Sequence, residues 1–313
     1  MDRMPIGLVF PGQGTQREGM GTPWRDTPSW KLTEEISDVT GEDLAVLLLD
    51  TPDEHLRRTD LAQLTVFTVA AVAHAEAVRR GTLAALGDVV ACAGHSLGEY
   101  AALTAAGALS LSAAAALVAA RGRAMRQAAE ERPGTMGVLV AAPLDEVGGL
   151  AERVRADGFD VWVANVNAPG QTVVSGSPEG IDRIEADAPS IGAKMIRLKV
   201  GGAFHSPYMA PAADSLRAAL KDTAFAPEHL PVVANADAES HTGDCDWPGL
   251  ATRQLTSPVL WEPAVRTLVG RLGCRSLVEI GPGRTLAGLI RRIAADTEVV
   301  SLDSPAALAA VGA

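Results

Sequence analysis

The chain has 313 residues, of which 47% are hydrophobic and 21% charged, a composition typical of a soluble globular protein and not of a disordered one. Acidic side chains outnumber basic ones by 38 to 27, and the net charge of −11 argues against binding to nucleic acid or to an anionic membrane surface. The three cysteines, Cys92, Cys245 and Cys274, show no Cys-x-x-Cys spacing, so we expect neither a disulfide framework nor a metal site, and a reducing compartment, by default the cytoplasm.

Apolar strands alternate with helices in the first part of the chain. Strand 6–10 ends at Pro11-Gly12-Gln13-Gly14, and strand 87–93 runs into a glycine-flanked serine. This alternation predicts an α/β sheet covered by helices on both faces. The apolar run 64–78 is interrupted by polar residues and is too short to cross a bilayer, so we expect no membrane span. Helices are expected over 29–40, 41–50, 61–79, 99–106 and 112–129.

A second unit begins after the break at Pro133-Gly134, and Gly201-Gly202 closes it. Its elements follow in the order β-α-β-β-α-β, which is the ferredoxin-like arrangement. The expected strands are 136–142, 160–164, 171–175 and 193–200, the helices are 144–156 and 178–188, and a turn is expected over 167–170.

The α/β pattern then resumes with helix 209–220, strands 231–235 and 276–280 and a helix from Arg284. We therefore predict an α/β fold with two parts. The larger is an α/β-hydrolase-like catalytic subdomain with a parallel sheet, residues 1–133 and 201–313. The smaller is an inserted ferredoxin-like subdomain, residues 134–200.

The pentapeptide Gly94-His95-Ser96-Leu97-Gly98 lies between strand 87–93 and helix 99–106. This Gly-x-Ser-x-Gly pattern is typical of a nucleophile elbow, a sharp strand-to-helix turn that exposes a serine hydroxyl. The N-terminus of the following helix points toward the place where an oxyanion would form. A glycine-flanked serine can also be an ordinary turn or helix cap.

A serine nucleophile needs a base, and histidine titrates near neutral pH. Of the six histidines, His205 lies in the glycine-rich junction where the insertion returns to the main sheet, and such a segment can overhang the elbow. The position alone leaves two roles open, the base or a turn histidine. His95 belongs to the elbow, and we expect its side chain to project away from the face of Ser96.

Six motifs together resemble the malonyl-CoA:acyl-carrier-protein transacylase family, which includes the acyltransferases of polyketide synthases. The similarity runs in order over essentially the whole chain. The motifs are Pro11-Gly12-Gln13-Gly14-Thr15-Gln16, Gly94-His95-Ser96-Leu97-Gly98-Glu99-Tyr100, Arg121-Gly122, residues 165–176 (NVNAPGQTVVSG), Phe204-His205-Ser206 and Glu279-Ile280-Gly281-Pro282-Gly283.

The resemblance implies a role for each matching residue. Ser96 would be acylated, and His205 would be its general base and then acid. The imidazole would be oriented by the backbone carbonyl of Gln254 instead of a carboxylate, and the amides of Gln13 and Leu97 would form the oxyanion hole.

Two further residues would select the acyl group. Periodicity alone favours a solvent-exposed Arg121, but the family places an arginine here to bind the free carboxylate of malonate, which a guanidinium holds through two parallel hydrogen bonds. We therefore place Arg121 in the substrate pocket with Phe204 and Gln254. A phenylalanine before the catalytic histidine is typical of malonyl-selective, free-standing polyketide-type enzymes, because the ring leaves no room for an α-methyl branch.

The implied reaction moves a malonyl group from malonyl-CoA to the phosphopantetheine thiol of an acyl carrier protein by ping-pong catalysis. We expect no resident cofactor and a monomer. Three alternatives stay open: a hydrolase of carrier-bound acyl groups, a non-catalytic carrier-binding scaffold, and an acyltransferase for another acyl unit. An acidic carrier protein would need a basic surface, for which the candidates are Lys194, Arg197, Lys199, Arg253 and Arg284.

Overall fold

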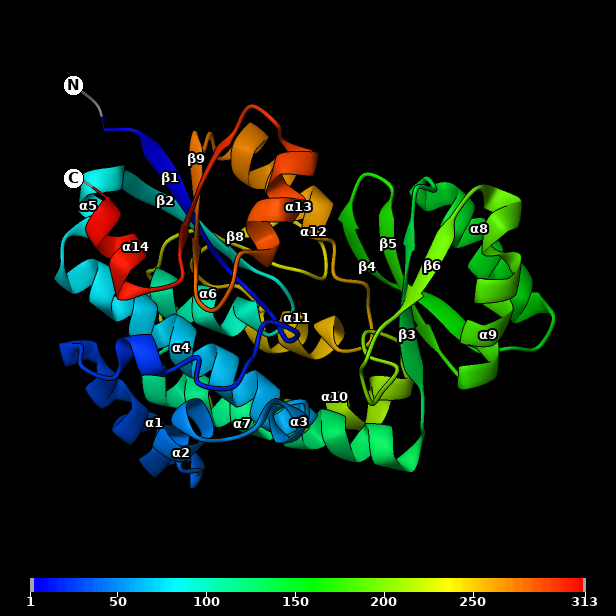
Figure 1. The fold of residues 1–313 in the computed structure, drawn as a ribbon, viewed down its shortest axis with the longest axis horizontal. Coiled ribbons are helices and arrows are strands. Elements are labelled where there is room, and N and C mark those ends of the chain that lie inside the picture. Colours follow the sequence, from blue (N-terminus) through cyan, green and yellow to red (C-terminus); the bar gives the residue numbers. More distant parts are fainter. Residues whose placement is uncertain (1–2, 312–313) are drawn as a thin grey trace.

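The computed structural model describes residues 3–311 and divides them into two lobes, each built on its own sheet (Figure 1). The larger sheet has the strand order β10-β9-β1-β2-β7-β8, in which all neighbours are parallel except β7 and β8. Its strands are β1 (Pro5–Phe10), β2 (Asp88–Gly94), β7 (Val232–Val233), β8 (Ser240–His241), β9 (Ser276–Ile280) and β10 (Glu298–Leu302).

Both faces of the larger sheet are buried, as expected for parallel strands. Leu8 and Phe10 of β1 point into the larger hydrophobic cluster, and Val9 between them points into a second one. The first face is covered by α1 (Leu32–Thr40), α2 (Leu44–Leu49), α4 (Thr59–Arg79), α6 (Gly98–Ala106), α7 (Leu111–Glu131), α10 (Ala210–Leu220), α11 (Trp247–Gln254) and α14 (Pro305–Ala310). The second is covered by α12 (Trp261–Arg266), a π-helical turn (Thr267–Arg271) and α13 (Thr285–Ile293).

The apolar segment 64–78 belongs to α4, which has 21 residues and is, among the described helices, the one long and apolar enough to cross a membrane. The expectation that this segment is too short was therefore wrong. Burial identifies its role instead, because 83% of its apolar window lies inside the protein. Helix α4 packs against α7 and α6 as a core helix.

The smaller sheet is antiparallel, with the order β4-β5-β3-β6. Its strands are β3 (Thr135–Val140), β4 (Val161–Ala168), β5 (Gln171–Gly176) and β6 (Lys194–Arg197), and α8 (Leu144–Ala156) and α9 (Pro178–Asp187) pack on it. This order and the β-α-β-β-α-β connectivity confirm the ferredoxin-like arrangement. The exact division at residues 133/134 and 200/201 stays a prediction.

Three local expectations were wrong. Strand β4 runs on to Ala168, so Asn167 lies in a strand and the turn is reduced to Pro169-Gly170. The stretch between 236 and 275, for which no element was expected, contains β8, α11, α12 and the π-helical turn. Short elements were also missed, because a few residues carry no readable period; they are α3 (Asp53–Leu56), α5 (Thr82–Leu86), β10, α14 and 3₁₀ turns at 22–24, 28–31, 188–191 and 207–209.

Candidate active site

Ser96 lies in a strained turn between β2 and α6. Its φ of +52° is a conformation that a residue with a side chain rarely adopts. A Cβ atom on Gly94 would lie 1.9 Å from the carbonyl carbon of Gly98, and one on Gly98 would lie 2.2 Å from the carbonyl oxygen of Phe10. Both glycines are therefore required for the chain to turn here, and the turn presents the Ser96 hydroxyl at the carboxyl end of β2.

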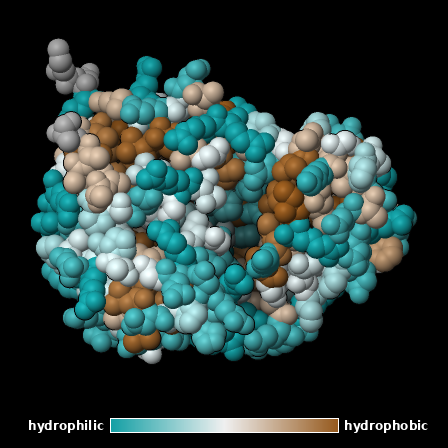
Figure 2. Space-filling view, in the orientation of Figure 1, coloured by the Kyte–Doolittle hydropathy of each residue, from teal (hydrophilic) through white to brown (hydrophobic). Residues whose placement is uncertain are grey.

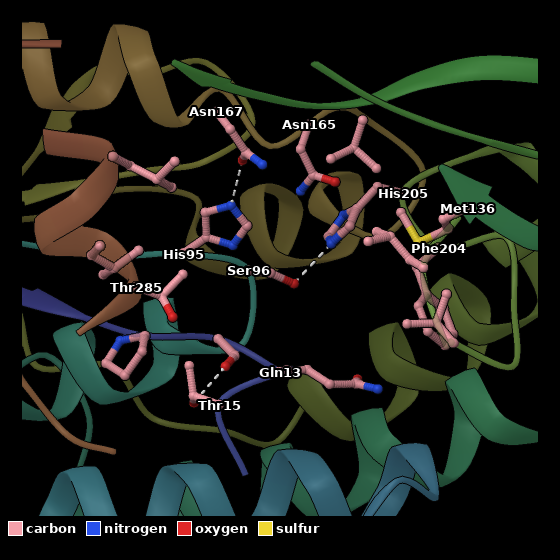
Figure 3. A pocket seen from close by; sticks show the side chains of 18 of the residues that line it. Gln13, Thr15, His95, Ser96, Met136, Asn165, Asn167, Phe204, His205 and Thr285 are labelled. Carbon is pink, nitrogen blue, oxygen red and sulfur yellow. Dashed lines mark hydrogen bonds between the residues drawn. The ribbon is translucent and has the colours of Figure 1, made fainter. Parts of the chain in front are cut away.

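His205 lies just after Gly201-Gly202, where the chain returns from the smaller lobe to the larger one, and its ring faces Ser96 (Figure 3). Its Nε2 lies 2.8 Å from Ser96 Oγ, and its Nδ1 lies 2.9 Å from the backbone oxygen of Gln254. Since a carbonyl only accepts, Nδ1 carries the proton and Nε2 is free to accept from the serine hydroxyl. Burial, and then the nearby Arg121 charge, lower the His205 pKa to about 3, so the imidazole is neutral and ready to act as a base.

Arg121, on α7, is completely buried and reaches the same serine. Its Nη2 donates to Ser96 Oγ and to Gln254 Oε1, each at 3.0 Å, and its Nη1 donates to Gln63 Oε1. Its Nε has no partner, and no carboxylate within the described residues is close enough for an ion pair. Burial lowers the Arg121 pKa. The solvent-exposed arginine favoured by periodicity is thus wrong, and the site contains a buried cation that hydrogen-bonds only uncharged groups among the described residues.

Two backbone amides near Ser96 have no hydrogen-bond acceptor within residues 3–311. They belong to Gln13, in the loop after β1, and to Leu97, directly before α6. The amide of Ser96 itself is occupied, because it donates to Asn235 Oδ1 at 2.6 Å. The geometry therefore leaves free the two donors that the sequence suggested for an oxyanion hole, and that role stays a prediction.

A cavity of about 240 Å³ lies between the lobes and opens onto Ser96. Ser96, His205, Phe204 and Gln13 line it. Leu97, Gln254 and Arg121 are not among the lining residues, but the Arg121 guanidinium reaches the lining through its hydrogen bond to Ser96 Oγ. Figure 2 shows the hollow between the lobes, with hydrophobic residues on the side of the smaller sheet. The apolar lining consists of Met125, Met136, Val173, Leu198, Val200, Phe204, Leu286 and Leu289.

Several polar residues of the site were not singled out from the sequence. His95 lines the cavity and bonds Asn167 Oδ1 through its Nε2 at 2.9 Å, so the expectation that it projects away from the serine was wrong (Figure 3). Gln63 is a fully buried amide on α4 that accepts from Arg121 Nη1, and its place between Ala62 and Leu64 in the apolar part of the helix is a signal that could have been used. Asn235 holds the elbow by accepting from Ser96 and donating to the Gly94 oxygen at 2.6 Å.

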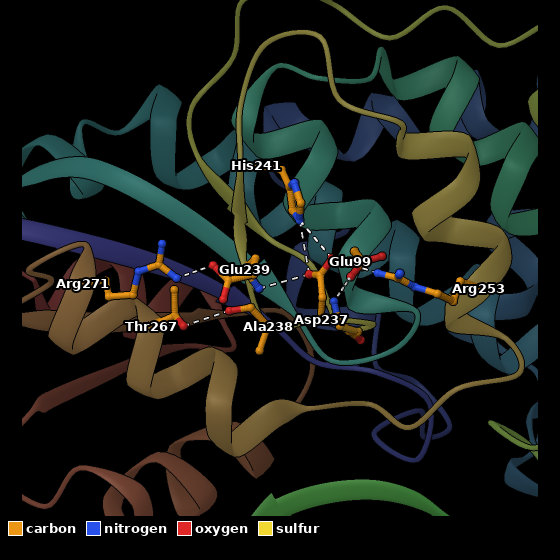
Figure 4. A network of polar contacts seen from close by, with 9 residues as sticks. Glu99, Asp237, Ala238, Glu239, His241, Arg253, Thr267 and Arg271 are labelled. Atoms are coloured by element: carbon orange, nitrogen blue, oxygen red, sulfur yellow. Dashed lines mark hydrogen bonds and ion pairs between the residues drawn. The ribbon is translucent and has the colours of Figure 1, made fainter.

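Glu99 is a further buried polar residue, on the first turn of α6. Burial raises its pKa, whereas the Asn235 amide, the Arg121 charge and the Gln254 amide lower it, and the two amides each donate to one oxygen of its carboxylate form. The neighbouring Asp237 adds to the rise, although its carboxylate is bound by His241 at 3.2 Å and Arg253 at 2.8 Å (Figure 4).

The basic residues suggested for a carrier-protein surface divide into two groups. Arg197 pairs with Asp182 and Glu185, Arg253 with Asp237 and Arg284 with Asp303. Lys194 and Lys199 are exposed and have no ion pair among the described residues. Paired arginines add little net positive charge, so the two lysines are the stronger candidates.

A family model described as an acyl transferase domain matches residues 8–302. The malonyl CoA-acyl carrier protein transacylase of Bacillus subtilis (strain 168) is 34% identical over 303 residues, which cover 96% of this chain and 94% of that protein. The protein of the same name from Escherichia coli (strain K12) is 34% identical over 310 residues, with 97% and 98% covered.

Solved structures agree with these matches. The crystal structure of MCAT from Mycobacterium tuberculosis has a TM-score of 0.91 at 33% identity and covers 99% of this chain and 100% of that one. A malonyl-transacylase in complex with a holo acyl-carrier protein of a type II polyketide synthase has a TM-score of 0.92 at 32% identity, with 98% of each chain covered.

Proposed function

The chain belongs to the acyl transferase domain family, as one of its malonyl-CoA:acyl-carrier-protein transacylases, and on this premise we propose that it moves a malonyl group from malonyl-CoA to the phosphopantetheine thiol of an acyl carrier protein. The observation that carries the proposal is the buried Arg121 guanidinium, whose Nη2 lies 3.0 Å from Ser96 Oγ and which forms no ion pair with a carboxylate of the described residues. A buried charge without a partner is costly, and the free carboxylate of a malonyl group would compensate it.

Acyl-donor binding begins at Arg121. Its unpartnered Nε and its Nη2 lie on one edge of the guanidinium and form a fork that fits a carboxylate. A carboxylate seated there replaces the Ser96 oxygen on Nη2 and leaves that oxygen free for attack. Acetyl-CoA offers no such group and leaves the cation unpaired, so the site disfavours it.

The first half-reaction forms an ester on Ser96. His205 Nε2 takes the hydroxyl proton while Oγ attacks the thioester carbonyl, and the amides of Gln13 and Leu97 hold the oxyanion. The carbon–sulfur bond then breaks, CoA leaves as a thiol with the proton from His205, and malonyl-Ser96 remains. The neutral state of His205 and its bond to the Gln254 oxygen suit it to both steps.

The second half-reaction repeats these steps with another thiol. His205 takes the proton of the phosphopantetheine thiol, the sulfur attacks the ester carbonyl, and the carbon–oxygen bond breaks to return the proton to Ser96. No step needs a resident cofactor or metal; the phosphopantetheine belongs to the partner. The apolar lining of the cavity supports exclusion of water from the ester.

The pathway and setting belong to the same proposal. The Phe204–His205 pair and the similarity to a transacylase bound to a polyketide carrier protein favour a free-standing enzyme that loads carrier proteins for polyketide or fatty-acid synthesis. We further propose that it works in the cytoplasm as a monomer.

Intact-mass spectrometry tests the proposal. Incubation with malonyl-CoA should add one malonyl group to the wild-type protein and none to Ser96→Ala, and holo acyl carrier protein should then remove it with the gain of one malonyl group on the carrier. Absence of the adduct contradicts the proposal. Release of free malonate at a rate that the carrier protein does not increase would identify a hydrolase instead.

A further inference from the structure

Glu99 is a buried acid that the proposed reaction does not use. Its side chain is 1% exposed and lies behind the nucleophile elbow. Both carboxyl oxygens accept a hydrogen bond: Oε2 from the backbone amide of Asn235 at 2.6 Å, and Oε1 from Gln254 Nε2 at 3.0 Å. The acid therefore connects a residue that holds the elbow with a residue that holds the cation.

The orientation of the Gln254 amide depends on this contact. Its Nε2 donates to two acceptors, the Ser96 oxygen and Glu99 Oε1, each at 3.0 Å, and its Oε1 accepts from Arg121 Nη2 at 3.0 Å. Both amide hydrogens are engaged, so the two acceptors determine which end of the amide faces the guanidinium. A reversed amide would place one donor against another at Arg121.

We propose that Glu99 is a positioning residue for acyl-donor selection: it fixes the Gln254 amide, and through that amide the place of the Arg121 guanidinium beside Ser96. The inference rests on the proposed function, since it concerns how the same site chooses a carboxylate-bearing donor. Glu99 does not touch the acyl group, and its effect on the choice of donor passes through Gln254.

The same acid also steadies the nucleophile through a second arm. Asn235, whose amide donates to Glu99, accepts from the Ser96 amide and donates to the Gly94 oxygen. Glu99 thus contacts both Gln254, which holds the Arg121 guanidinium, and Asn235, which holds Ser96, and so it helps to set the distance between the guanidinium and Ser96 Oγ. An amide at position 99 cannot replace it, because its NH₂ end would meet either the Asn235 amide or the Gln254 amide, both donors.

The test is the ratio of malonyl to acetyl loading in Glu99→Gln, measured as kcat/KM for acylation from each CoA ester. We expect malonyl loading to fall by roughly 10²-fold, the scale of a displacement of about 1 Å at a reacting group, while acetyl loading, which needs no ordered cation, falls less. Equal losses for both donors, or no loss for either, would overturn the inference.

A double-mutant cycle separates positioning from a general structural role. Gln254→Met removes the amide and keeps the backbone oxygen that orients His205. If Glu99 acts through Gln254, the double variant should be no less selective than Gln254→Met alone, whereas multiplicative effects would contradict the relay. If Glu99→Gln does not fold, Glu99→Asp replaces it in this test. The aspartate is too short to reach both Asn235 and Gln254, so the malonyl-to-acetyl loading ratio should again fall.

Glu76→Gln is the matched control, since it makes the same change at another fully buried acid that lies in α4 and contacts Arg79, Arg80 and Ser29. It should leave the malonyl-to-acetyl ratio unchanged. The wild-type protein in the same assay distinguishes failure of the proposed function from failure of this inference. If the wild type does not load malonyl, the proposed function is contradicted. If the wild type loads malonyl normally and Glu99→Gln leaves the malonyl-to-acetyl ratio unchanged, only the inference is contradicted.

Discussion

Two charged groups are completely buried on neighbouring helices, and their surroundings differ. Glu76 on α4 accepts hydrogen bonds from Arg79, Arg80 and Ser29, and these contacts, led by Arg79, lower its pKa to about 2. Arg121 on α7 donates hydrogen bonds only to uncharged side chains among the described residues, and its Nε has no hydrogen-bond partner there.

The difference separates a structural charge from a functional one. A buried charge that is fully compensated within the fold has no capacity left for a ligand, and removing it affects stability. A buried charge that faces only neutral dipoles is held in place at a cost, and a ligand of opposite charge lowers that cost. Burial alone does not distinguish the two groups; the missing partner does.

The largest effect should come from removing the uncompensated charge. Arg121→Ala deletes the fork proposed to hold the carboxylate, so malonyl loading should fall by roughly 10²–10³-fold, the equivalent of two charge-assisted hydrogen bonds, while slow acetyl loading stays measurable. Stopped-flow acylation with each CoA ester measures both rates.

Arg123→Ala is the control for this change, because Arg123 is exposed on the same helix and should leave both rates unchanged. If Arg121→Ala slowed malonyl and acetyl loading by the same factor, the cation would serve the fold or the serine and not the choice of donor.

A second large effect concerns pH, because burial, and then the Arg121 charge, lower the His205 pKa from 6.5 to about 3. The neutral base should persist in acid, so the acylation rate should stay level from pH 7 to pH 5. With an ordinary histidine pKa of about 6.5, the neutral fraction of the base, and with it the acylation rate, would fall about 25-fold over that range. Rapid-quench acylation at each pH measures this, and a fall with a midpoint near 6.5 would contradict the shifted base.

The same shift affects stability with a defined sign. Between pH 6.5 and about 3 the unfolded chain binds a proton at His205 and the native protein does not, so the His205 contribution should reduce the free energy of unfolding as the pH falls through this window. Urea unfolding of wild type and His205→Gln at pH 7 and pH 5 should show a smaller pH dependence in the variant. Equal pH dependence in both would contradict the assignment.

The sequence supported the elements with long, regular patterns and the motifs with unusual residue types. The Gly94 and Gly98 pair, the serine between them and the β-α-β-β-α-β order could be read directly, because turns and periods are local properties. The contacts of Arg121 could not, since they join α4, α7 and α11 from distant parts of the chain. Periodicity reports the average face of a helix and cannot show that one polar residue lies inside.

The residues missed around the serine have the same cause. Asn235 lies in a turn two residues after the very short strand β7, and its role depends on a contact with the elbow 139 residues away. His95 was assigned the wrong direction because the turn at Ser96, and not strand alternation, determines where its ring points. Glu99 appeared in a motif, but its value lies in the partners that the fold brings to it.

Removing the compensated charge should affect stability and leave catalysis intact. Glu76→Gln loses the charge-assisted hydrogen bonds to Arg79 and Arg80, so we expect the free energy of unfolding to fall by about 1–3 kcal/mol, with malonyl loading unchanged. Because the Glu76 pKa is lowered from 4.5 to about 2, its stabilising effect is present above pH 4.5 and is lost as the pH falls toward 2.

Urea unfolding at pH 7 measures this loss, and the acylation assay on the same sample measures activity. Loss of malonyl selectivity in Glu76→Gln would contradict the separation of the two charges, because it would show that a compensated charge also takes part in donor choice.

The smallest effect should come from the shape of the pocket at Phe204, which carries no charge. Phe204 is buried beside His205 and lines the cavity, and we expect its ring to limit the space next to the α-carbon of the acyl group. Phe204→Ser should raise the methylmalonyl-to-malonyl loading ratio by roughly tenfold, since one methyl group is worth about 1–3 kcal/mol in such a pocket. Competition between the two CoA esters, read by the mass of the acylated carrier protein, measures the ratio.

Phe159→Ser, at an exposed phenylalanine of the smaller lobe, is the control and should leave the ratio unchanged. If the ratio rose by as large a factor as malonyl loading falls in Arg121→Ala, shape and not charge would dominate the choice of donor. A modest rise, with malonyl loading still dependent on Arg121, would show that the two residues act on different parts of the same acyl group.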